Sequence, residues 1–367
     1  MLKKNKKIVY LSMFIVLLLL VIFTQGIYAQ AEKIFEGQKL IIAMPGGTWA
    51  EVTEKYIIGP FEEETGADII ISDYGTSADA FTKLIVGKET GNFPYDVIVF
   101  GGGWQEKALI AGGLLQPMDY TKITNLSSLY PAAQPRYKIA PYKGYGPDID
   151  FASLPLVYRT DKIKMDITSW YDLFNPQFKG KVGFINPINL GGVTLLWTLQ
   201  LSEGGNLYDP SLSKAFELLK EKLIPQDPVI WQSSSQSQIL LSQGEMWISQ
   251  IWDGRAFELK KKGLPIKIII PKEGAWTTKT TIDIVEGCKN IELAHAYINY
   301  RLSPKAQAAF TTYLFYGFTN PLAEQYIPKE VLQIIFSGKE MEGLRTIDYV
   351  YLQEHQDEWT QKFLELK

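Results

Sequence analysis

Short apolar runs alternate with helical stretches through the first third of the chain. The pattern predicts strands at residues 40–44, 67–74 and 96–100, separated by a helix at 49–64 and a second helix capped by Ser77. The β-branched run Ile69-Ile70-Ile71 is typical of a strand buried on both faces. Strands that alternate with helices in this way predict a parallel α/β unit.

A second unit of the same kind follows in the middle of the chain. Its predicted strands are residues 181–185, 246–251 and 266–270, and its predicted helices are 190–201 and 211–223. Helix-poor, extended stretches at 149–159 and 271–284 join the two units. Two such crossings predict a hinge between two lobes.

The length of 367 residues agrees with two lobes, because one core seldom grows beyond about 250–300 residues. We therefore expect an α/β protein with a ligand cleft between its lobes. The expected first lobe comprises residues 32–152 and 281–330, and the expected second lobe comprises 153–280. Residues 331–367 are expected to form a C-terminal helical segment that packs on the lobes.

The amino terminus has the three parts of an export signal. Four lysines precede an apolar stretch at residues 8–23, and Ala29-Gln30-Ala31 supplies an A-x-A cleavage pattern. We expect residues 1–31 to be a cleaved signal peptide and the body to be periplasmic. The alternative is an uncleaved anchor, which would also leave the body outside the cytoplasm.

The composition of the body excludes several function classes. Beyond residue 31 the chain carries 33 basic and 40 acidic residues and no dense basic stripe, which argues against a nucleic-acid partner. His295, His355 and Cys288 are its only histidines and cysteine, too few for a Cys/His zinc site. They form no catalytic constellation either. We expect no metal, no cofactor and no enzymatic activity, and a monomer.

Nine short motifs occur in one order along the chain and carry a family resemblance. They are Gly46-Gly47-Thr48-Trp49, Pro60-Phe61-Glu62-Glu63-Glu64-Thr65-Gly66, Tyr95-Asp96-Val97-Ile98-Val99, Ser169-Trp170-Tyr171-Asp172-Leu173, Lys179-Gly180-Lys181, Gly244-Glu245-Met246, Ile251-Trp252-Asp253-Gly254-Arg255, Pro271-Lys272-Glu273-Gly274 and Gly317-Phe318-Thr319-Asn320-Pro321. In these motifs the chain resembles the extracytoplasmic solute-binding proteins of ABC importers, in their spermidine/putrescine-binding branch.

The resemblance implies the type II periplasmic-binding-protein fold, in which two lobes close on a small molecule and deliver it to a membrane permease. It implies a small polar solute, such as a polyamine-like amine, as the ligand. A ferric-ion-binding relative would need adjacent tyrosines, and this chain has no Tyr-Tyr pair. An enzyme on the same fold remains a rival function.

The resemblance also points to ligand-binding residues. Trp252 matches the indole platform of the family, and Asp253 beside it could hold an ammonium group or only cap a helix. Tyr316 falls within one residue of an aromatic ligand contact. The turns after the first and third strands add further candidates, namely Gly47, Thr48, Trp49, Gly101, Gly102 and Trp104. Asp148 and Asp150 could face the cleft from the first crossing.

Thr278 and Thr280 stand where polyamine binders carry a Trp and an Asp. Two neutral hydroxyls cannot balance a buried ammonium group. The segment 186–192 likewise lacks carboxylates and offers a Gly-rich helix start suited to an anion. An amino acid or another carboxylate is therefore the alternative to a polyamine-like ligand.

Overall fold

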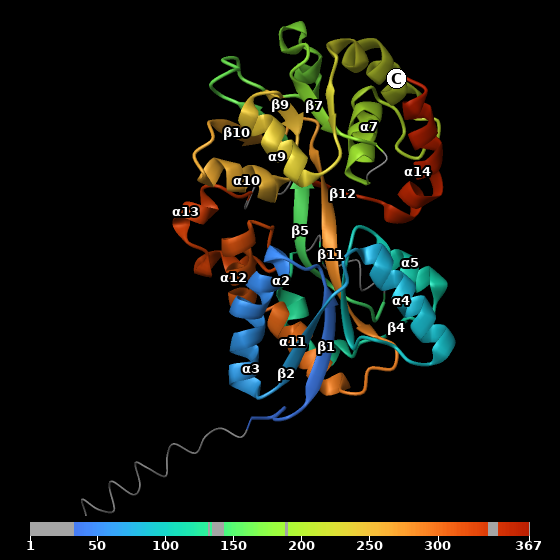
Figure 1. The fold of residues 1–367 in the computed structure, drawn as a ribbon, viewed down its shortest axis with the longest axis vertical. Helices are drawn as coiled ribbons and strands as arrows, with labels where there is room; N and C mark the ends of the chain where they lie inside the picture. The colour runs from blue at the N-terminus through green and yellow to red at the C-terminus, as the bar shows by residue number, and fades with distance from the viewer. Residues whose placement is uncertain (1–32, 131–132, 134–142, 188–189, 337–343, 367) are drawn as a thin grey trace, which may run out of the picture.

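Two separate β-sheets organise the chain into two lobes (Figure 1). The computed structural model describes residues 33–130, 133, 143–187, 190–336 and 344–366. The predicted signal peptide therefore lies outside the described residues. No helix within these ranges has the length and hydropathy that a bilayer span requires.

The first sheet has seven strands in the order β12-β11-β3-β1-β2, with β4 and β5 also paired to β11. They are β1 (Lys39–Met44), β2 (Asp68–Asp73), β3 (Val97–Gly101), β4 (Leu115–Gln116), β5 (Asp148–Leu154), β11 (Ala275–Val285) and β12 (Leu344–Thr346). The first three strands are parallel, as their alternation with helices predicts, whereas β11 runs antiparallel to β3. The sheet is therefore mixed.

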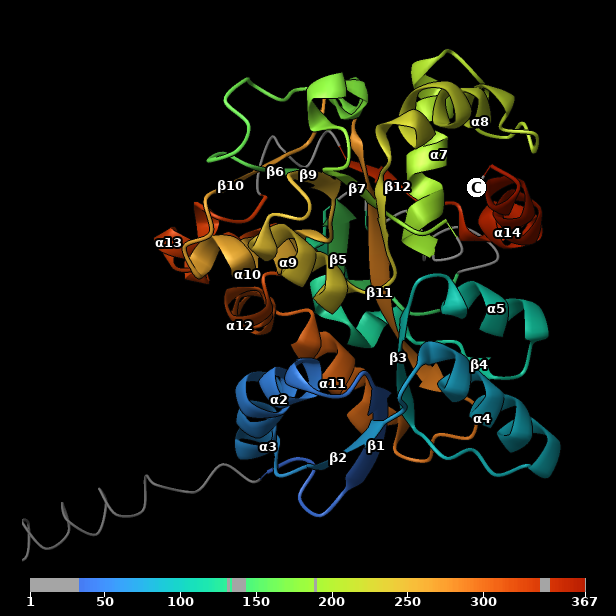
Figure 2. The same ribbon diagram turned by 45° about the horizontal axis from the view of Figure 1, so that its top comes forward.

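Helices cover both faces of this sheet (Figure 2). On one face lie α2 (Thr48–Thr53), α3 (Gly59–Thr65), α11 (Ile291–Arg301) and α12 (Pro304–Leu314). On the other face lie α4 (Ser77–Thr90) and α5 (Trp104–Ala111). A π-helical turn, Glu54–Ile58, joins α2 to α3, so that the predicted helix at 49–64 is one continuous helical run.

The second sheet has five strands in the order β10-β6-β9-β7-β8. They are β6 (Leu156–Arg159), β7 (Val182–Ile185), β8 (Val229–Trp231), β9 (Ile248–Gln250) and β10 (Ile266–Ile269). The helices of this part are α7 (Leu190–Ser202), α8 (Ser213–Leu218), α9 (Ser234–Gln243) and α10 (Asp253–Lys261). The C-terminal α14 (Tyr349–Leu364) packs beside α7, where Trp359 and Phe363 enter the same hydrophobic cluster as Trp197.

Short helical turns complete the described structure. Besides α13 (Lys329–Leu332) they are 3-10 helices at Tyr120–Lys122, Thr124–Ser128, Trp170–Phe174, Pro176–Phe178, Ile224–Gln226 and Pro321–Tyr326, and a π-helical turn at Leu219–Leu223.

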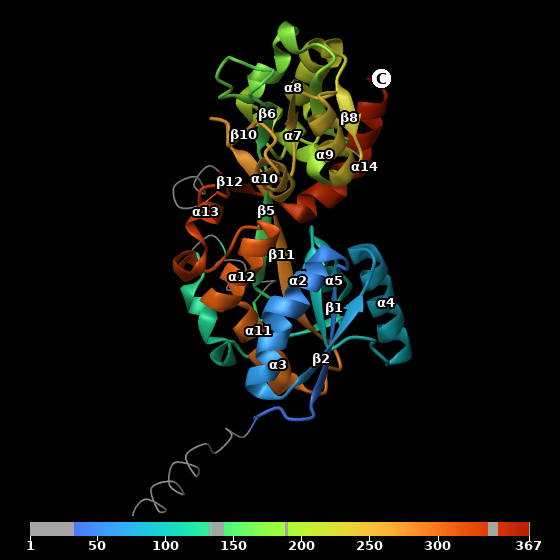
Figure 3. The same ribbon diagram turned by 60° about the vertical axis from the view of Figure 1, so that its left-hand side comes forward.

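Two neighbouring strands, β5 and β11, run between the lobes (Figure 3). They pair antiparallel from Trp276 opposite Leu154 to Thr281 opposite Asp148. β5 continues after one residue into β6 of the second sheet, and β11 follows β10 of that sheet. These strands occupy the two stretches where the sequence predicts crossings, and we call them the crossing strands.

Two local predictions are wrong. β2 is not buried on both faces, because it forms the edge of its sheet and leaves Ile70 40% exposed. The cap of α4 is Thr76 rather than Ser77. The Thr76 side chain accepts a hydrogen bond from the Asp79 N–H, and the Asp79 carboxylate accepts one from the Thr76 N–H, which completes a capping box.

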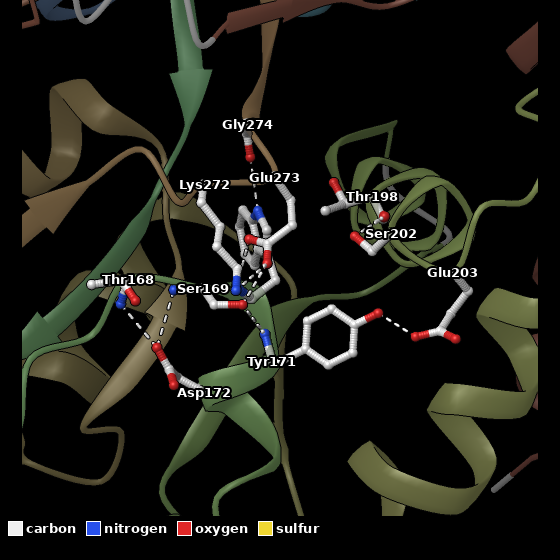
Figure 4. A network of polar contacts seen from close by, with 11 residues as sticks. Thr168, Ser169, Tyr171, Asp172, Thr198, Ser202, Glu203, Lys272, Glu273 and Gly274 are labelled. Carbon is white, nitrogen blue, oxygen red and sulfur yellow. Dashed lines mark hydrogen bonds and ion pairs between the residues drawn. The ribbon is translucent and has the colours of Figure 1, made fainter.

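A polar network joins the second lobe to the segment that leads into β11 (Figure 4). The Glu273 carboxylate accepts hydrogen bonds from the Ser169 hydroxyl and from the Trp170 N–H, the latter at 3.2 Å. The indole Nε1 of the fully buried Trp170 donates to the Gly274 carbonyl oxygen at 2.8 Å. Because the Glu273 side chain is only 12% exposed, its charge depends on these donors. The network therefore fixes where β11 leaves the second lobe.

Replacing Glu273 by glutamine should lower the free energy of unfolding by about 1–2 kcal/mol, because two hydrogen bonds lose their charged acceptor. Urea unfolding followed by tryptophan fluorescence measures this change. Glu245→Gln, at an exposed position of the same lobe, is the matched control and should leave the midpoint unchanged. Equal midpoints for the two variants would refute a stabilising role for Glu273.

Candidate ligand cleft

A cavity of about 1030 Å³ lies between the lobes, large enough for a small organic molecule. Most of its lining comes from the turn after β1, the crossing strands, the start and outer face of α10, and the end of α12, and the ends of β2 and β3 and the start of α9 add to it. The lining residues are Pro45, Gly46, Gly47, Thr48, Trp49, Tyr74, Ser77, Gly101, Ala152, Ser234, Trp252, Asp253, Gly254, Arg255, Glu258, Lys261, Lys262, Thr278, Thr280, Tyr313, Leu314, Phe315 and Tyr316.

The turn between β1 and α2 reaches the cavity because glycines allow a close approach. A Cβ atom on Gly46 would lie 1.9 Å from the Asp73 carboxylate, so a larger residue there would require the Asp73 side chain to move. Gly47 adopts a φ of +62°, which side chains rarely adopt. Trp49 is 8% exposed and packs edge-on against Phe310, with 5.0 Å between ring centroids. The helix start therefore presents Thr48 and one edge of Trp49 to the cavity.

Trp252 connects the core of the second lobe to the cavity. It precedes α10 directly as the N-cap residue, and its carbonyl oxygen accepts hydrogen bonds from the N–H groups of Arg255 and Ala256, both at 3.0 Å. The half-buried indole packs against the cluster that contains Trp231. The remaining surface of the indole lines the cavity, as a platform for an apolar or cationic ligand group requires.

Asp253 lines the cavity but is only 2% exposed. Its Oδ2 accepts hydrogen bonds from the Ser153 N–H, at 2.8 Å, and from the Ser153 hydroxyl, and its Oδ1 accepts one from the Gly254 N–H at 2.7 Å. Burial raises the pKa of the Asp253 carboxyl to about 7, although these donors favour the charged form. Asp253 thus ties α10 to crossing strand β5.

The outer face of α10 adds four charged side chains to the cavity: Arg255, Glu258, Lys261 and Lys262. The Glu258 carboxylate lies 2.6 Å from the Lys262 Nζ and 3.5 Å from an Arg255 Nη. Lys261 lies over the Phe315 ring, with its Nζ 5.1 Å from the centroid. Basic side chains therefore outnumber acidic ones in the lining.

The crossing strands form the floor of the cavity. Thr278 and Thr280 face it from β11, and strand alternation turns Lys279 to the opposite side. There the Lys279 Nζ lies 3.0 Å from an oxygen of the buried Asp148. Lys279 therefore forms its ion pair with Asp148 on the side of the sheet that faces away from the cavity. Tyr316, beside the floor, has its pKa raised to about 12, mainly by burial.

The structure brings most of the predicted site residues to one cavity. Those on the lining are Gly47, Thr48, Trp49, Gly101, Trp252, Asp253, Thr278, Thr280 and Tyr316. Gly102 and Trp104 are not part of the lining. Trp104 begins α5 and packs on Phe81 with 5.5 Å between ring centroids, while the Lys107 Nζ covers it at 4.3 Å. The chain has already turned away from the cavity at these residues.

The anion site predicted at 186–192 lies partly outside the described residues, because 188 and 189 are not described. On its described part, the Asn186 side-chain amide donates to the Gln232 side chain at 3.2 Å, and α7 begins at Leu190. The described part of this segment contributes no residue to the cavity lining.

Sequence reasoning missed several lining residues for which a signal exists. Tyr74 directly follows strand β2. Its position at the end of a strand is the same as that of the candidates named after β1 and β3. Arg255, Glu258 and Lys262 are spaced by three and four residues, so they share one face of α10. Tyr313 lies in the last turn of α12 and stacks on Tyr56 with 3.8 Å between ring centroids. The spacing of the α10 residues indicates a shared helical face, but it does not show that this face borders the cleft.

The described residues contain no group of three or more His, Cys, Asp or Glu side chains that could hold a metal ion. The arrangement instead combines aromatic rings, hydroxyl groups and charges of both signs around a cavity. Such a lining can bind a small polar molecule without changing it.

Comparison with known proteins places the chain in a family. Residues 57–332 match the model of the bacterial extracellular solute-binding proteins. The chain is 30% identical to spermidine/putrescine-binding periplasmic protein 1 of Haemophilus influenzae over 291 residues, 78% of each chain. It is 24% identical to the gamma-aminobutyric acid-binding protein of Pseudomonas aeruginosa over 352 residues, 92% of this chain and 93% of the relative.

A solved structure shares the fold. The crystal structure of an ABC transporter protein from Clostridium perfringens is similar with a TM-score of 0.76 and 23% identity, over 89% of this chain and 99% of that one. The two-lobed α/β architecture and the family match agree with the resemblance seen in the sequence motifs. The chain belongs to the bacterial extracellular solute-binding proteins.

Proposed function

We propose that this protein captures a small solute carrying both an ammonium and a carboxylate group, such as an ω-amino acid, and delivers it to the permease of an ABC importer. It acts in the periplasm as a monomer and not as an enzyme. The lobes it closes comprise residues 32–152 with 281–330 and residues 153–280. The names of the two sequence relatives, which concern polyamines and gamma-aminobutyric acid, support an amine as ligand.

The charges of the cavity lining carry the choice of a zwitterion. Both carboxylates among the described lining residues are engaged by the protein itself, Asp253 by three donors and Glu258 by Lys262, Arg255 and Gln238. A polyamine carries two or more ammonium groups, and each needs a carboxylate partner when it is desolvated. Arg255 is 47% exposed on its side chain and can pair with a ligand carboxylate. A ligand of zero net charge fits this lining better than a polycation.

Isothermal titration calorimetry with 4-aminobutanoate, putrescine, spermidine and butanoate at one pH and salt concentration tests the proposal. We expect 4-aminobutanoate to bind at least about tenfold more tightly than either polyamine, a difference of about 1.4 kcal/mol. Butanoate lacks the ammonium group and should bind weakly.

Polyamine capture is the second candidate, and the aromatic lining of Trp49, Trp252 and Tyr316 favours it. Tighter binding of putrescine or spermidine than of 4-aminobutanoate would establish that candidate and reject the zwitterion.

A further inference from the structure

Asp150 lies beside Thr280 at the floor of the cavity. It lies on crossing strand β5 and is 1% exposed. The register of β5 and β11 places it opposite Thr280, so that the two side chains share one face of the sheet. Thr280 itself lines the cavity. Asp150 is therefore the cross-strand neighbour of a residue that lines the cavity.

The buried Asp150 carboxylate uses only part of its capacity to accept hydrogen bonds. Its Oδ2 lies 3.4 Å from an Nη of Arg301, at the long end of the hydrogen-bond range. Its Oδ1 has no hydrogen-bond partner among the described residues. Arg301 is equally buried. Its guanidinium lies over the Phe310 ring, with Cζ 4.2 Å from the ring centroid. A buried charged oxygen without a partner is costly and calls for an explanation.

The surroundings of Asp150 are those of a cation site that also faces the cavity. Burial raises the pKa of the Asp150 carboxyl to about 6 and the charge of Asp148 adds to this effect, whereas the Arg301 guanidinium and the Thr280 hydroxyl favour the charged form. Tyr74 and Tyr316 both line the cavity. Burial raises their pKa values to about 12, and the negative charge of Asp150 contributes a smaller part of this rise. Asp253 and Glu258, the acids on the lining itself, are already engaged.

We propose that Asp150 is a positioning residue for the ammonium group of the ligand, which binds against the Thr280 hydroxyl on the cavity floor. This inference rests on the proposed capture of an amine. A hydroxyl has one donor and two acceptor sites, so Thr280 can donate to Asp150 and accept from the ammonium group. At low dielectric the negative charge beside the hydroxyl strengthens this interaction. The floor can thus bind a positively charged group although its described lining residues are neutral.

A double-mutant cycle on the full chain tests this coupling. Asp150→Asn and Thr280→Val should each weaken 4-aminobutanoate binding about tenfold in calorimetry, and the double variant should bind no more weakly than either single variant. Both variants should also lose most of the preference for 4-aminobutanoate over butanoate. A purely structural role would lower thermal stability without changing this preference.

Asp148→Asn is the matched control. Asp148 is an equally buried acid of the same strand, but its partner Lys279 turns away from the cavity. Its replacement should change the affinity less than twofold. If Asp150→Asn fails to fold because Arg301 is left unpaired, Asp150→Asn combined with Arg301→Met removes both charges and should show the same loss of preference.

The outcomes separate this inference from the proposed function. Additive losses in the cycle, or unchanged 4-aminobutanoate binding in Asp150→Asn, would overturn the role of Asp150 while the zwitterion proposal stands. If wild type binds putrescine instead, the zwitterion proposal fails and the same cycle is run with putrescine, with the same expected coupling. If wild type binds none of the three amines, the ammonium site itself is refuted.

Discussion

Replacing Asp253 by asparagine is expected to remove a loss of stability that the wild type suffers between about pH 5 and pH 7. Burial raises the pKa of this carboxyl to about 7 in the folded protein, whereas in an unfolded chain it is about 3.9. Between these values the folded protein holds a proton that the unfolded chain has lost. The free energy of unfolding therefore falls as the pH rises through this window.

One proton over two pH units corresponds to a change of about 2 kcal/mol in the stability of the wild type relative to Asp253→Asn. Urea unfolding of both proteins at pH 5, 6 and 7 measures the difference. Asp150 also titrates near pH 6, but it is present in both proteins and cancels.

Asp161→Asn is the control for this experiment, because the exposed Asp161 pairs with Arg159 and its pKa is lowered. Asp161 is ionised in both the folded and the unfolded chain across pH 5 to 7, so the difference from wild type should stay flat. Parallel pH curves for wild type and Asp253→Asn would show that the Asp253 carboxyl is ionised throughout.

The fold could be predicted from the sequence wherever local patterns determine it. Apolar runs predicted β1 and β3, because each run reflects the burial of that segment alone. Ile70 shows the limit of this reasoning. Three consecutive isoleucines look the same in a central strand and in an edge strand, and only the strand order exposes one of them.

The cap of α4 shows a signal that was present and misread. Thr76 and Ser77 can both cap a helix, but only Thr76 has an acidic residue three positions later. The spacing from the cap to the acidic residue distinguishes Thr76 from Ser77, because a capping box requires that Asp79 occupy the third helical position.

The candidate site could be predicted where it lies at strand ends, as for Thr48 and Trp252. Asp150 could be named as an acid of a crossing strand, yet its place beside Thr280 depends on the register of two strands about 130 residues apart. Arg255 depends in the same way on which face of α10 borders the opposite lobe. Long-range packing sets these relations, and a local pattern does not contain them.

Trp252→Ala should produce the largest loss of ligand affinity of any single substitution proposed for this cleft. The indole supplies both apolar contact area and a π-face for the ammonium group, worth together about 2–3 kcal/mol. The expected loss is on the order of a hundredfold in the dissociation constant for 4-aminobutanoate, measured by calorimetry. Because part of the indole packs on the second-lobe core, thermal unfolding should also show a modest loss of stability.

Trp104→Ala separates the two effects of removing an indole. Trp104 also stands at the start of a helix after a strand, and it is also half-buried, but it packs on Phe81 and lies outside the cavity lining. Its replacement should cost stability through lost packing while the affinity for 4-aminobutanoate stays within about twofold of wild type. If both variants weaken binding equally, the loss in Trp252→Ala reflects a general loosening of the lobes. If only Trp252→Ala does so, the indole contacts the ligand.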